Sequence, residues 1–409
     1  MTATYPLLEA GDVVDYLRRC GLDRLLGDGR AEVRDVTGGN MNRVFVARAG
    51  GRGVAVKQAP PWVQVAGPDW PASPDRIAAE ARAYGYLAGL VPDIVPVVHA
   101  FDASSYVLVM EDLSDLRVLR DVLVEGVGAA AAGTAAPGEP DAVGLGEAVG
   151  RFVGELTFAT SDLTMTAAER AALTAAAVNP DLCQLTLDVL LDEPYRPHEH
   201  NRFDPALRAD VEAMYADDAL KVAVSELRSV FRSRAEALIH GDLHTGSVMV
   251  GRRDGAAAVK VFDPEFSFVG PIGFDLGLWW ANLAIAAAAA RASGRTDLAD
   301  ARQAAVRASW DAFERVWRSR WPSRVDTAFA DGYLDSWLAR IRREAVGFAG
   351  IEAVRRVAGY SHAADLTTLP DDVRVPAQRR VLRAAVRWIT EHAAATSAAD
   401  LPNVPTEEP

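Results

Sequence analysis

The segment Leu238–Gly277 constrains the fold of this chain more than any other stretch. It reads LIHGDLHTGSVMVGRRDGAAAVKVFDPEFSFVGPIGFDLG. Two β-prone runs, at Val248–Val250 and Ala258–Phe262, flank a turn rich in glycine and arginine, and this pattern predicts a β-hairpin. One aspartate between two histidines precedes the hairpin, and two further acids follow it. The hairpin is therefore expected to hold three carboxylates in one frame.

These three carboxylates have the chemistry that is needed to move a phosphoryl group. Asp242 can orient an attacking hydroxyl group and accept its proton as the new bond to phosphorus forms. Asp263 and Glu265 are separated by one residue on an extended segment, so both can face one side and hold Mg²⁺ against nucleotide phosphates. We expect His240, close to Asp242, to be a hydrogen-bonded structural residue.

The composition limits the fold class and the partners. The chain has 409 residues, of which 50% are hydrophobic, enough for two lobes around a cleft and for a sizeable core. The net charge of −13 argues against a nucleic-acid partner, which would require a basic stripe. The two cysteines are too few for a disulfide framework and indicate a reducing compartment.

No membrane partner is expected either. The first residues lack a basic stretch followed by an apolar run, so we expect no signal peptide. The most apolar stretch, Leu276–Ala290, contains Asn282 and is too short to cross a bilayer, so it is expected to form a buried helix. These features predict a cytoplasmic protein.

The secondary-structure pattern predicts an α+β fold with two lobes. Residues 1–112 read as a helix at Leu8–Cys20, then strands, then a second helix at Asp75–Leu90 and further strands. This pattern indicates a small mixed β-sheet and an N-terminal nucleotide-binding lobe. Residues 113–409 are mostly helical in pattern and would form the C-terminal catalytic and substrate lobe. The helices expected there include Pro205–Val230, Thr327–Val346 and Gly350–Ala364. The layout is that of a bilobal, protein-kinase-like fold.

Three features of the N-terminal lobe could bind a nucleotide. Lys57 is a rare lysine in an arginine-rich chain and could contact phosphates as a compact charge, although a strand-end lysine can equally extend into water. Gly38, Gly39 and Asn40 could bring backbone amides close to phosphates, although they could also form an ordinary hairpin turn. Glu80 could pair with Lys57 if its helix packs behind the sheet; otherwise it is a surface glutamate.

An apolar strand runs into a polar connector between the two predicted lobes. The connector contains Glu111, Asp112 and Leu113. Its backbone could form hydrogen bonds with the edge of an adenine ring held between the lobes.

Taken together, these motifs resemble the protein-kinase-like and aminoglycoside-phosphotransferase-like group, and more closely the S-methyl-5-thioribose kinases. The resemblance spans most of the chain. It is carried by GGNMN at 38–42, VKQ at 56–58, WP at 70–71, VMEDLS at 109–114, HGDLHTGS at 240–247, DPEF at 263–266, GPIGFDLG at 270–277 and GFAGIEAVRRVAGYSHAADL at 347–366. The HGDLHTGS and DPEF motifs are specific to this family, whereas the glycine turn is not.

The resemblance implies that ATP and Mg²⁺ are used to phosphorylate the 1-hydroxyl group of methylthioribose, and that the protein is a homodimer. It implies that Lys57 holds the α- and β-phosphates, that Asp242 is the base, and that Asp263 and Glu265 hold the metal. The resemblance also places Asn42 of GGNMN at the nucleotide. Protein kinases have Asp-Phe-Gly where this chain has Asp-Pro-Glu, as in the thioribose kinases.

Further site residues follow from the resemblance alone. Ser247 stands where the wider group has a metal-binding asparagine, and a hydroxyl group is a weaker ligand. Arg355 and Arg356 match the arginine pair of the family's substrate site, and we expect one to face the cleft while the other braces it. Trp70 matches a substrate-side tryptophan that would form an apolar wall for the methylthio group.

Two alternatives remain at this point. The substrate could be another small alcohol, such as 5-deoxyribose, homoserine, choline or an aminoglycoside, although an arginine pair would repel the cationic ones. The chain could also be a catalytically silent kinase fold that only binds, which predicts loss of Lys57, Asp242 or Asp263. Separately, the triplet 198–200, His-Glu-His, fits no zinc signature and shows no fourth ligand, so we expect a solvated loop there.

Overall fold

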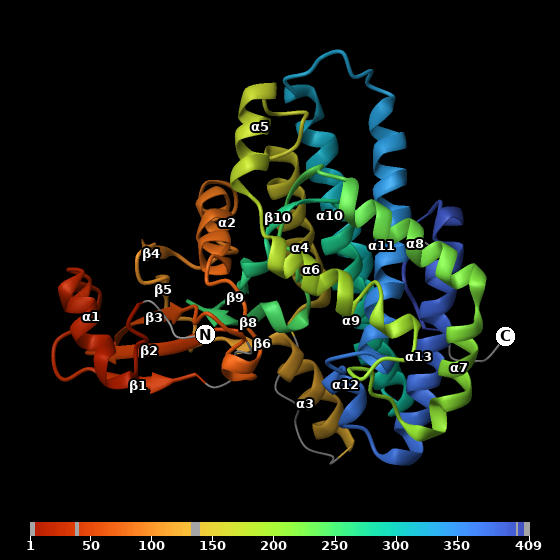
Figure 1. The fold of residues 1–409 in the computed structure, drawn as a ribbon, viewed down its shortest axis with the longest axis horizontal. Coiled ribbons are helices and arrows are strands. Elements are labelled where there is room, and N and C mark those ends of the chain that lie inside the picture. Colours follow the sequence, from red (N-terminus) through yellow and green to blue (C-terminus); the bar gives the residue numbers. More distant parts are fainter. Residues whose placement is uncertain (1–4, 37–40, 132–139, 398–399, 405–409) are drawn as a thin grey trace.

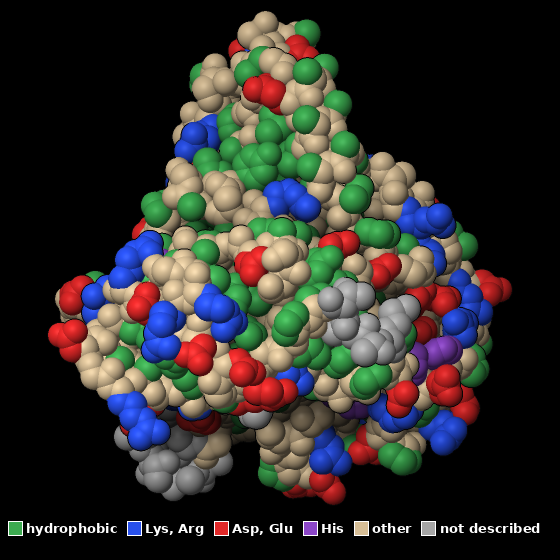
Figure 2. Space-filling view, turned by 60° about the vertical axis from the view of Figure 1, so that its left-hand side comes forward, with side chains coloured by type: hydrophobic (Ala, Val, Ile, Leu, Met, Phe, Trp, Pro, Cys, Tyr) green, Lys and Arg blue, Asp and Glu red, His purple; other side chains and the backbone are tan. Residues whose placement is uncertain are grey.

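A computed structural model describes residues 5–36, 41–131, 140–397 and 400–404. A small, sheet-containing lobe lies on the left of Figure 1, and a larger, mostly helical lobe lies on the right. The predicted α+β, bilobal fold is therefore confirmed. On the face shown in Figure 2, acidic and basic side chains are interspersed among hydrophobic ones.

The small lobe is built on a five-stranded sheet with the order β1-β2-β3-β5-β4. Every neighbouring pair in it is antiparallel, so the prediction of a mixed sheet is wrong. The reason is the connection after β3, which runs through a helix to the edge strand β4 and then returns by a hairpin, so that β5 lies antiparallel to β3. The strands are β1 (Glu32–Asp35), β2 (Arg43–Ala49), β3 (Arg52–Gln58), β4 (Val98–Asp102) and β5 (Val107–Glu111).

The two faces of this sheet are covered by different helices. Helix α1 (Val13–Arg19) packs with Val54 and Val56 of β3 in a small core on one face. Helix α2 (Arg76–Leu90), close to the predicted 75–90, shares a core with Ala55 on the other face. Side chains alternate along a strand, so Lys57 lies on the α2 side of the sheet.

Two short sheets lie where the lobes meet. The hairpin β8 (Val248–Arg253) to β9 (Ala256–Val261) is confirmed, and β6 (Arg117–Val118) extends it. Strands β7 (Ala237–Ile239) and β10 (Phe268–Gly270) form an antiparallel pair. The predicted acids lie at the ends of these strands. Strand β7 ends just before His240-Gly241-Asp242, and β9 ends just before Phe262-Asp263.

The segment that follows α2 is attached to the hairpin before it joins the five-stranded sheet at β4. The Lys260 ammonium donates a hydrogen bond to the carbonyl oxygen of Val95 at 2.7 Å. The backbone N–H of Val261 donates to the carbonyl oxygen of Ile94, also at 2.7 Å. The C-terminal end of α2 is thereby connected to β9.

The large lobe packs around one apolar helix, α9 (Gly273–Ala292). This helix is long and apolar enough to cross a membrane, but its apolar residues are 100% buried within the protein. That burial is expected for the core helix predicted at 276–290. Around it lie α3 (Leu119–Ala131), α4 (Ala142–Ala159), α5 (Ala167–Ala176), α6 (Pro180–Val189), α7 (Arg208–Ala216), α8 (Asp218–Ser233), α10 (Thr296–Arg320), α11 (Tyr333–Ala358), α12 (Ala364–Thr367) and α13 (Asp371–Glu391).

Two of the predicted helix boundaries are wrong. The helix expected at 205–230 is two helices, because the Asp217 side chain accepts the backbone N–H of Leu220 and starts a new helix there. The helices expected at 327–346 and 350–364 are largely one, α11, which runs through Gly347 and Gly350. A Cβ atom on Gly350 would lie 2.6 Å from the carbonyl oxygen of Ala385, so this glycine permits close helix packing rather than ending the helix.

Candidate active site

The turn that carries Asp242 is held by a buried carboxylate. Asp275, at the start of α9, accepts the backbone N–H groups of His240 at 2.7 Å and Gly241 at 2.9 Å. Gly241 has φ +85°, and a Cβ atom there would lie 2.3 Å from the carbonyl oxygen of Phe266. Only glycine fits this close approach, and the turn is therefore fixed from both sides.

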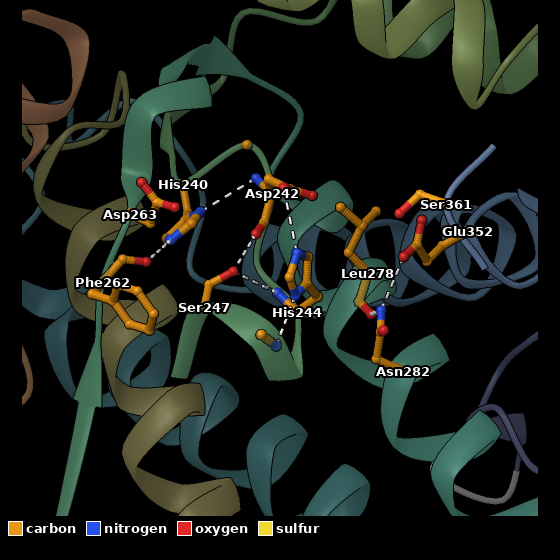
Figure 3. A network of polar contacts seen from close by, with 12 residues as sticks. His240, Asp242, His244, Ser247, Phe262, Asp263, Leu278, Asn282, Glu352 and Ser361 are labelled. Carbon is orange, nitrogen blue, oxygen red and sulfur yellow. Dashed lines mark hydrogen bonds and ion pairs between the residues drawn. The ribbon is translucent and has the colours of Figure 1, made fainter. Parts of the chain in front are cut away.

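His240 joins this turn to the strand that carries the other acids. Its Nε2 lies 3.0 Å from the carbonyl oxygen of Phe262, while its Nδ1 accepts the backbone N–H of Asp242 at 3.3 Å. The ring is fully buried. These contacts agree with the expected structural role, and Figure 3 shows the ring between the Asp242 turn and Phe262, next to Asp263.

Asp242 is ionised by its surroundings. Burial alone would raise its pKa, but the charge of His244 and a hydrogen bond from it, with the fields of Arg355 and Arg356, lower the pKa below the usual value. The His244 Nε2 atom lies 3.5 Å from a carboxylate oxygen of Asp242. The hydroxyl group of Ser247 donates to the backbone carbonyl of Asp242 at 2.7 Å, so this hydroxyl group supports the turn (Figure 3).

A lysine from the sheet meets three carboxylates between the lobes. The Lys57 ammonium lies 2.6 Å from Glu80 of α2 and also pairs with Asp263. The carboxylate oxygens of Glu80, Asp263 and Glu265 lie within 4.8 Å of one another. Asp263 has a left-handed conformation, φ +70°, and its backbone N–H donates to the Tyr84 hydroxyl group at 2.9 Å. The predicted pairing of Glu80 with Lys57 is thus present.

The charges in this cluster suit a divalent cation. Burial raises the pKa of Glu80 to about 7, against the opposing charge of Lys57. Burial and the charge of Asp263 raise the pKa of Glu265 well above its ordinary value. Burial is the larger cause of both shifts, and the three carboxylates of the cluster face only the charges of Lys57 and Arg76. An all-oxygen donor set with excess negative charge fits Mg²⁺.

Arg76 was not predicted as a site residue, and it organises this cluster. It is 1% exposed, and its guanidinium donates to the carbonyl oxygens of Met41 at 2.8 Å and Pro60 at 2.9 Å. Its Nε donates to the Asn42 side chain at 2.9 Å, and Asn42 in turn donates to Glu265. No local sequence signal marks this role, because most of the partners are backbone carbonyls.

The predicted arginine pair is held by one buried carboxylate. Glu352, fully buried in α11, accepts hydrogen bonds from Arg355 at 2.8 Å and from Arg356 at 2.7 Å. Asn282 of α9 donates to the same carboxylate at 3.0 Å (Figure 3). Both arginines are thus braced by Glu352, and the expectation that one of them faces the cleft remains a prediction. The spacing of three and four residues is a signal that could have revealed this arrangement.

The connector between the lobes is cross-linked by its side chains. Glu111 pairs with Arg253 and lies 3.6 Å from Lys260, whereas Asp112 pairs with Arg48. The carbonyl oxygen of Leu113 accepts a backbone N–H from the following turn. Any contact of this connector with an adenine ring remains a prediction.

The loop that carries Trp70 closes against two rings of the large lobe. The Trp70 ring stacks on His200, with centroids 5.8 Å apart and planes at 19°, and lies 6.0 Å from the Tyr360 ring. The triplet 198–200 lies in a loop in which Glu199 is exposed, while His198 and His200 are partly exposed beside buried Glu193. The predicted phosphate turn at 38–40 lies outside the described residues.

The bilobal fold and the lysine–carboxylate cluster between its lobes are those of a kinase-like phosphotransferase. In kinase-like phosphotransferases a lysine on the third strand pairs with a helix glutamate beside carboxylates of the larger lobe. The model of the phosphotransferase enzyme family matches residues 32–315.

Curated relatives narrow the class. A methylthioribose kinase of Geobacillus kaustophilus (strain HTA426) is 38% identical over 405 residues, which cover 98% of this chain and 96% of that protein. A methylthioribose kinase of Bacillus cereus (strain ATCC 10987 / NRS 248) is 34% identical, over 85% of this chain and 84% of that protein. The chain belongs to the methylthioribose kinase family of phosphotransferases. Among solved structures, a microcompartment-associated aminopropanol kinase aligns with a TM-score of 0.47 and 12% identity, over 96% of this chain and 100% of that chain.

Proposed function

We propose that this protein transfers the γ-phosphoryl group of ATP to the 1-hydroxyl group of S-methyl-5-thioribose, in methionine salvage. The observation that carries this proposal is the similarity, at 34% to 38% identity over most of the chain, to several proteins named methylthioribose kinase. The cytoplasm is the proposed location, and a small sugar, rather than nucleic acid or membrane, is the proposed partner.

The proposed nucleotide site lies between the lobes. Lys57, positioned by Glu80, would hold the phosphates, and Asp263 and Glu265, with Ser247 as a weaker third ligand, would hold Mg²⁺. When bound, the ion neutralises phosphate charge. The remaining proposed ATP contacts are Gly38, Gly39, Asn40 and Asn42 of the turn, with Glu111, Asp112 and Leu113 of the connector.

Asp242 is the proposed base. Its low pKa keeps it ionised at neutral pH, so it can accept a hydrogen bond from the sugar hydroxyl group and orient it. The proton moves to the carboxylate as the new oxygen–phosphorus bond forms, because the hydroxyl group becomes acidic only then. Arg355 and Arg356 lie close enough to influence the Asp242 charge and would stabilise negative charge on the transferring group.

The same arginines support a neutral acceptor over a cationic one such as choline or an aminoglycoside. Trp70 is the proposed apolar wall for the methylthio group. 5-Deoxyribose differs only at that position, and an apolar pocket distinguishes such a change by about 1–3 kcal/mol. An assay of ADP release should therefore compare methylthioribose, 5-deoxyribose, homoserine and an aminoglycoside. Equal or faster turnover on any of the last three would overturn the substrate assignment.

A second test concerns the base. Asp242→Asn should abolish nearly all turnover while ATP binding, measured by calorimetry, is retained. The exposed hairpin-turn variant Asp254→Asn is the matched control and should keep full activity. Unchanged turnover of Asp242→Asn would refute the role of this carboxylate.

Two organisational features are proposed on the family resemblance. The lobes would be residues 1–112 and 113–409, and the protein would be a homodimer. A mass equal to one chain in light scattering would contradict the dimer.

A further inference from the structure

A cluster outside the proposed active site combines two imidazoles with one buried carboxylate. Glu193 begins a short 3-10 turn, Glu193–Tyr195, and its side chain is 9% exposed. His198 and His200 follow in the same loop, with side chains that are 22% and 35% exposed. Glu193 is the ligand that the sequence pattern did not reveal, because four residues including two prolines separate it from the histidine triplet.

The distances match those between the ligands of a tetrahedral ion. One carboxylate oxygen of Glu193 lies 3.0 Å from Nδ1 of His200 and 3.6 Å from Nδ1 of His198. One ligand atom of each of the three residues lies within 4.8 Å of the others. Ligands at zinc bond lengths in a tetrahedron are about 3.4 Å apart. A simple Glu–His hydrogen bond would explain the contact of His200, but it leaves unexplained a second imidazole turned to the same oxygen.

The tautomer of His198 also suits a metal ligand. Its Nδ1 accepts a long hydrogen bond, 3.3 Å, from the backbone N–H of His200. This nitrogen is therefore unprotonated and has a lone pair that a metal ion could use. A bound ion would replace that contact. Two neutral imidazoles and one carboxylate give a donor set with one negative charge, and imidazole ligands favour zinc-class ions over Mg²⁺.

The loop around the cluster is supported by further contacts. The Asn201 side chain donates to the backbone carbonyl of Glu193 at 2.8 Å and to the Tyr215 hydroxyl group at 3.0 Å. The His200 ring is stacked beneath Trp70. Supporting hydrogen bonds of this kind orient metal ligands and raise affinity.

We propose that Glu193, His198 and His200 bind one divalent transition-metal ion of the zinc class. The three residues leave a fourth position for water, and the partly exposed imidazoles give the ion a route from solvent. Because the ion would fix His200, which stacks on Trp70, the site would join the 193–200 loop to the Trp70 loop. The proposal does not depend on the phosphoryl acceptor.

The test is calorimetric titration of the full-length, chelator-treated protein with Zn²⁺ in excess Mg²⁺, which occupies the carboxylate cluster of the proposed active site. One Zn²⁺ per chain is expected, with a thermal unfolding midpoint that rises with Zn²⁺ concentration. Glu193→Gln and His198→Ala should each weaken binding by more than about tenfold. Titration with Co²⁺ should give the visible absorption of a four-coordinate complex in the wild type and in neither cluster variant.

Exposed His99 on β4 provides the matched control, and His99→Ala should bind Zn²⁺ as the wild type does. The metal-free unfolding midpoint of each variant shows whether it has folded. Absence of Zn²⁺ uptake by the wild type, or unchanged uptake in both cluster variants, would overturn the proposal.

Discussion

Replacing Glu352 by glutamine should destabilise the protein strongly, because this one carboxylate balances two buried arginines. One of its oxygens accepts Nε of Arg355 at 2.8 Å, and the other accepts Nε of Arg356 at 2.7 Å. The amide of glutamine keeps one acceptor, but its NH₂ group would face a guanidinium donor. Both guanidinium groups would then lose the carboxylate that pairs with them directly and keep only the charge of Asp242.

The magnitude follows from that geometry. Removing one partner of a buried ion pair lowers stability by about 3–5 kcal/mol, since an unbalanced charge stays in the interior. Chemical unfolding at pH 7, followed by circular dichroism, should show a decrease of that size for Glu352→Gln. The control Glu314→Gln removes a partly exposed pair with Arg318 and should change the unfolding free energy by less than about 1 kcal/mol.

The pH dependence provides an independent check. Burial raises the pKa of Glu352, but Arg355 and Arg356 outweigh it, so the folded-state pKa lies below the ordinary value of 4.5. The stabilisation is therefore complete above pH 4.5 and is lost as the pH falls through the folded-state pKa. The difference between wild type and variant should shrink in that acid range. A difference below about 1 kcal/mol at pH 7 would refute the reasoning.

Two further predictions concern the active-site frame. Gly241→Ala should lower the free energy of unfolding by about 1–2 kcal/mol because of its positive φ, and by a further ~1–3 kcal/mol because its Cβ atom would clash with Phe266. The control Gly255→Ala also has a positive φ, but nothing lies within 4 Å of its Cβ position, so it should show only the first effect. Equal losses of the two variants in chemical unfolding would contradict the clash. The pKa of Glu80 is raised to about 7, so without Mg²⁺ its contribution to stability, about 3 kcal/mol, should be lost as the pH rises from 4.5 to 7. Glu80→Gln should flatten that part of the profile, and an unchanged slope would refute the raised pKa.

The parts of the site that were predictable from sequence depend on short-range patterns. The hairpin follows from two β-prone runs around a glycine turn, and it places Asp263 at the end of a strand. The meeting of Lys57 with Glu80 follows from strand alternation and from a helix behind the sheet. Such features are set by periodicity within one or two elements, and periodicity can be read from a single sequence.

The parts that were missed depend on packing between distant segments. Arg76 contacts backbone carbonyls of two loops, and carbonyl groups leave no mark in a sequence. Gly350 looks like a helix end, yet it lies inside α11 because α13 packs closely against it. Glu193 approaches the two histidines only because of how its loop folds.

The attachment of α2 to β9 has a mechanical consequence. Ile94 and Val95 are bonded to the hairpin, so the helix that carries Glu80 is tethered to the large lobe at its C-terminal end. Lys57 lies on the five-stranded sheet, to which the same segment is bonded through Val97 and Glu111 of β5. Because α2 also packs on the five-stranded sheet, this attachment holds the ammonium, its glutamate and the acids that follow β9 in one connected frame.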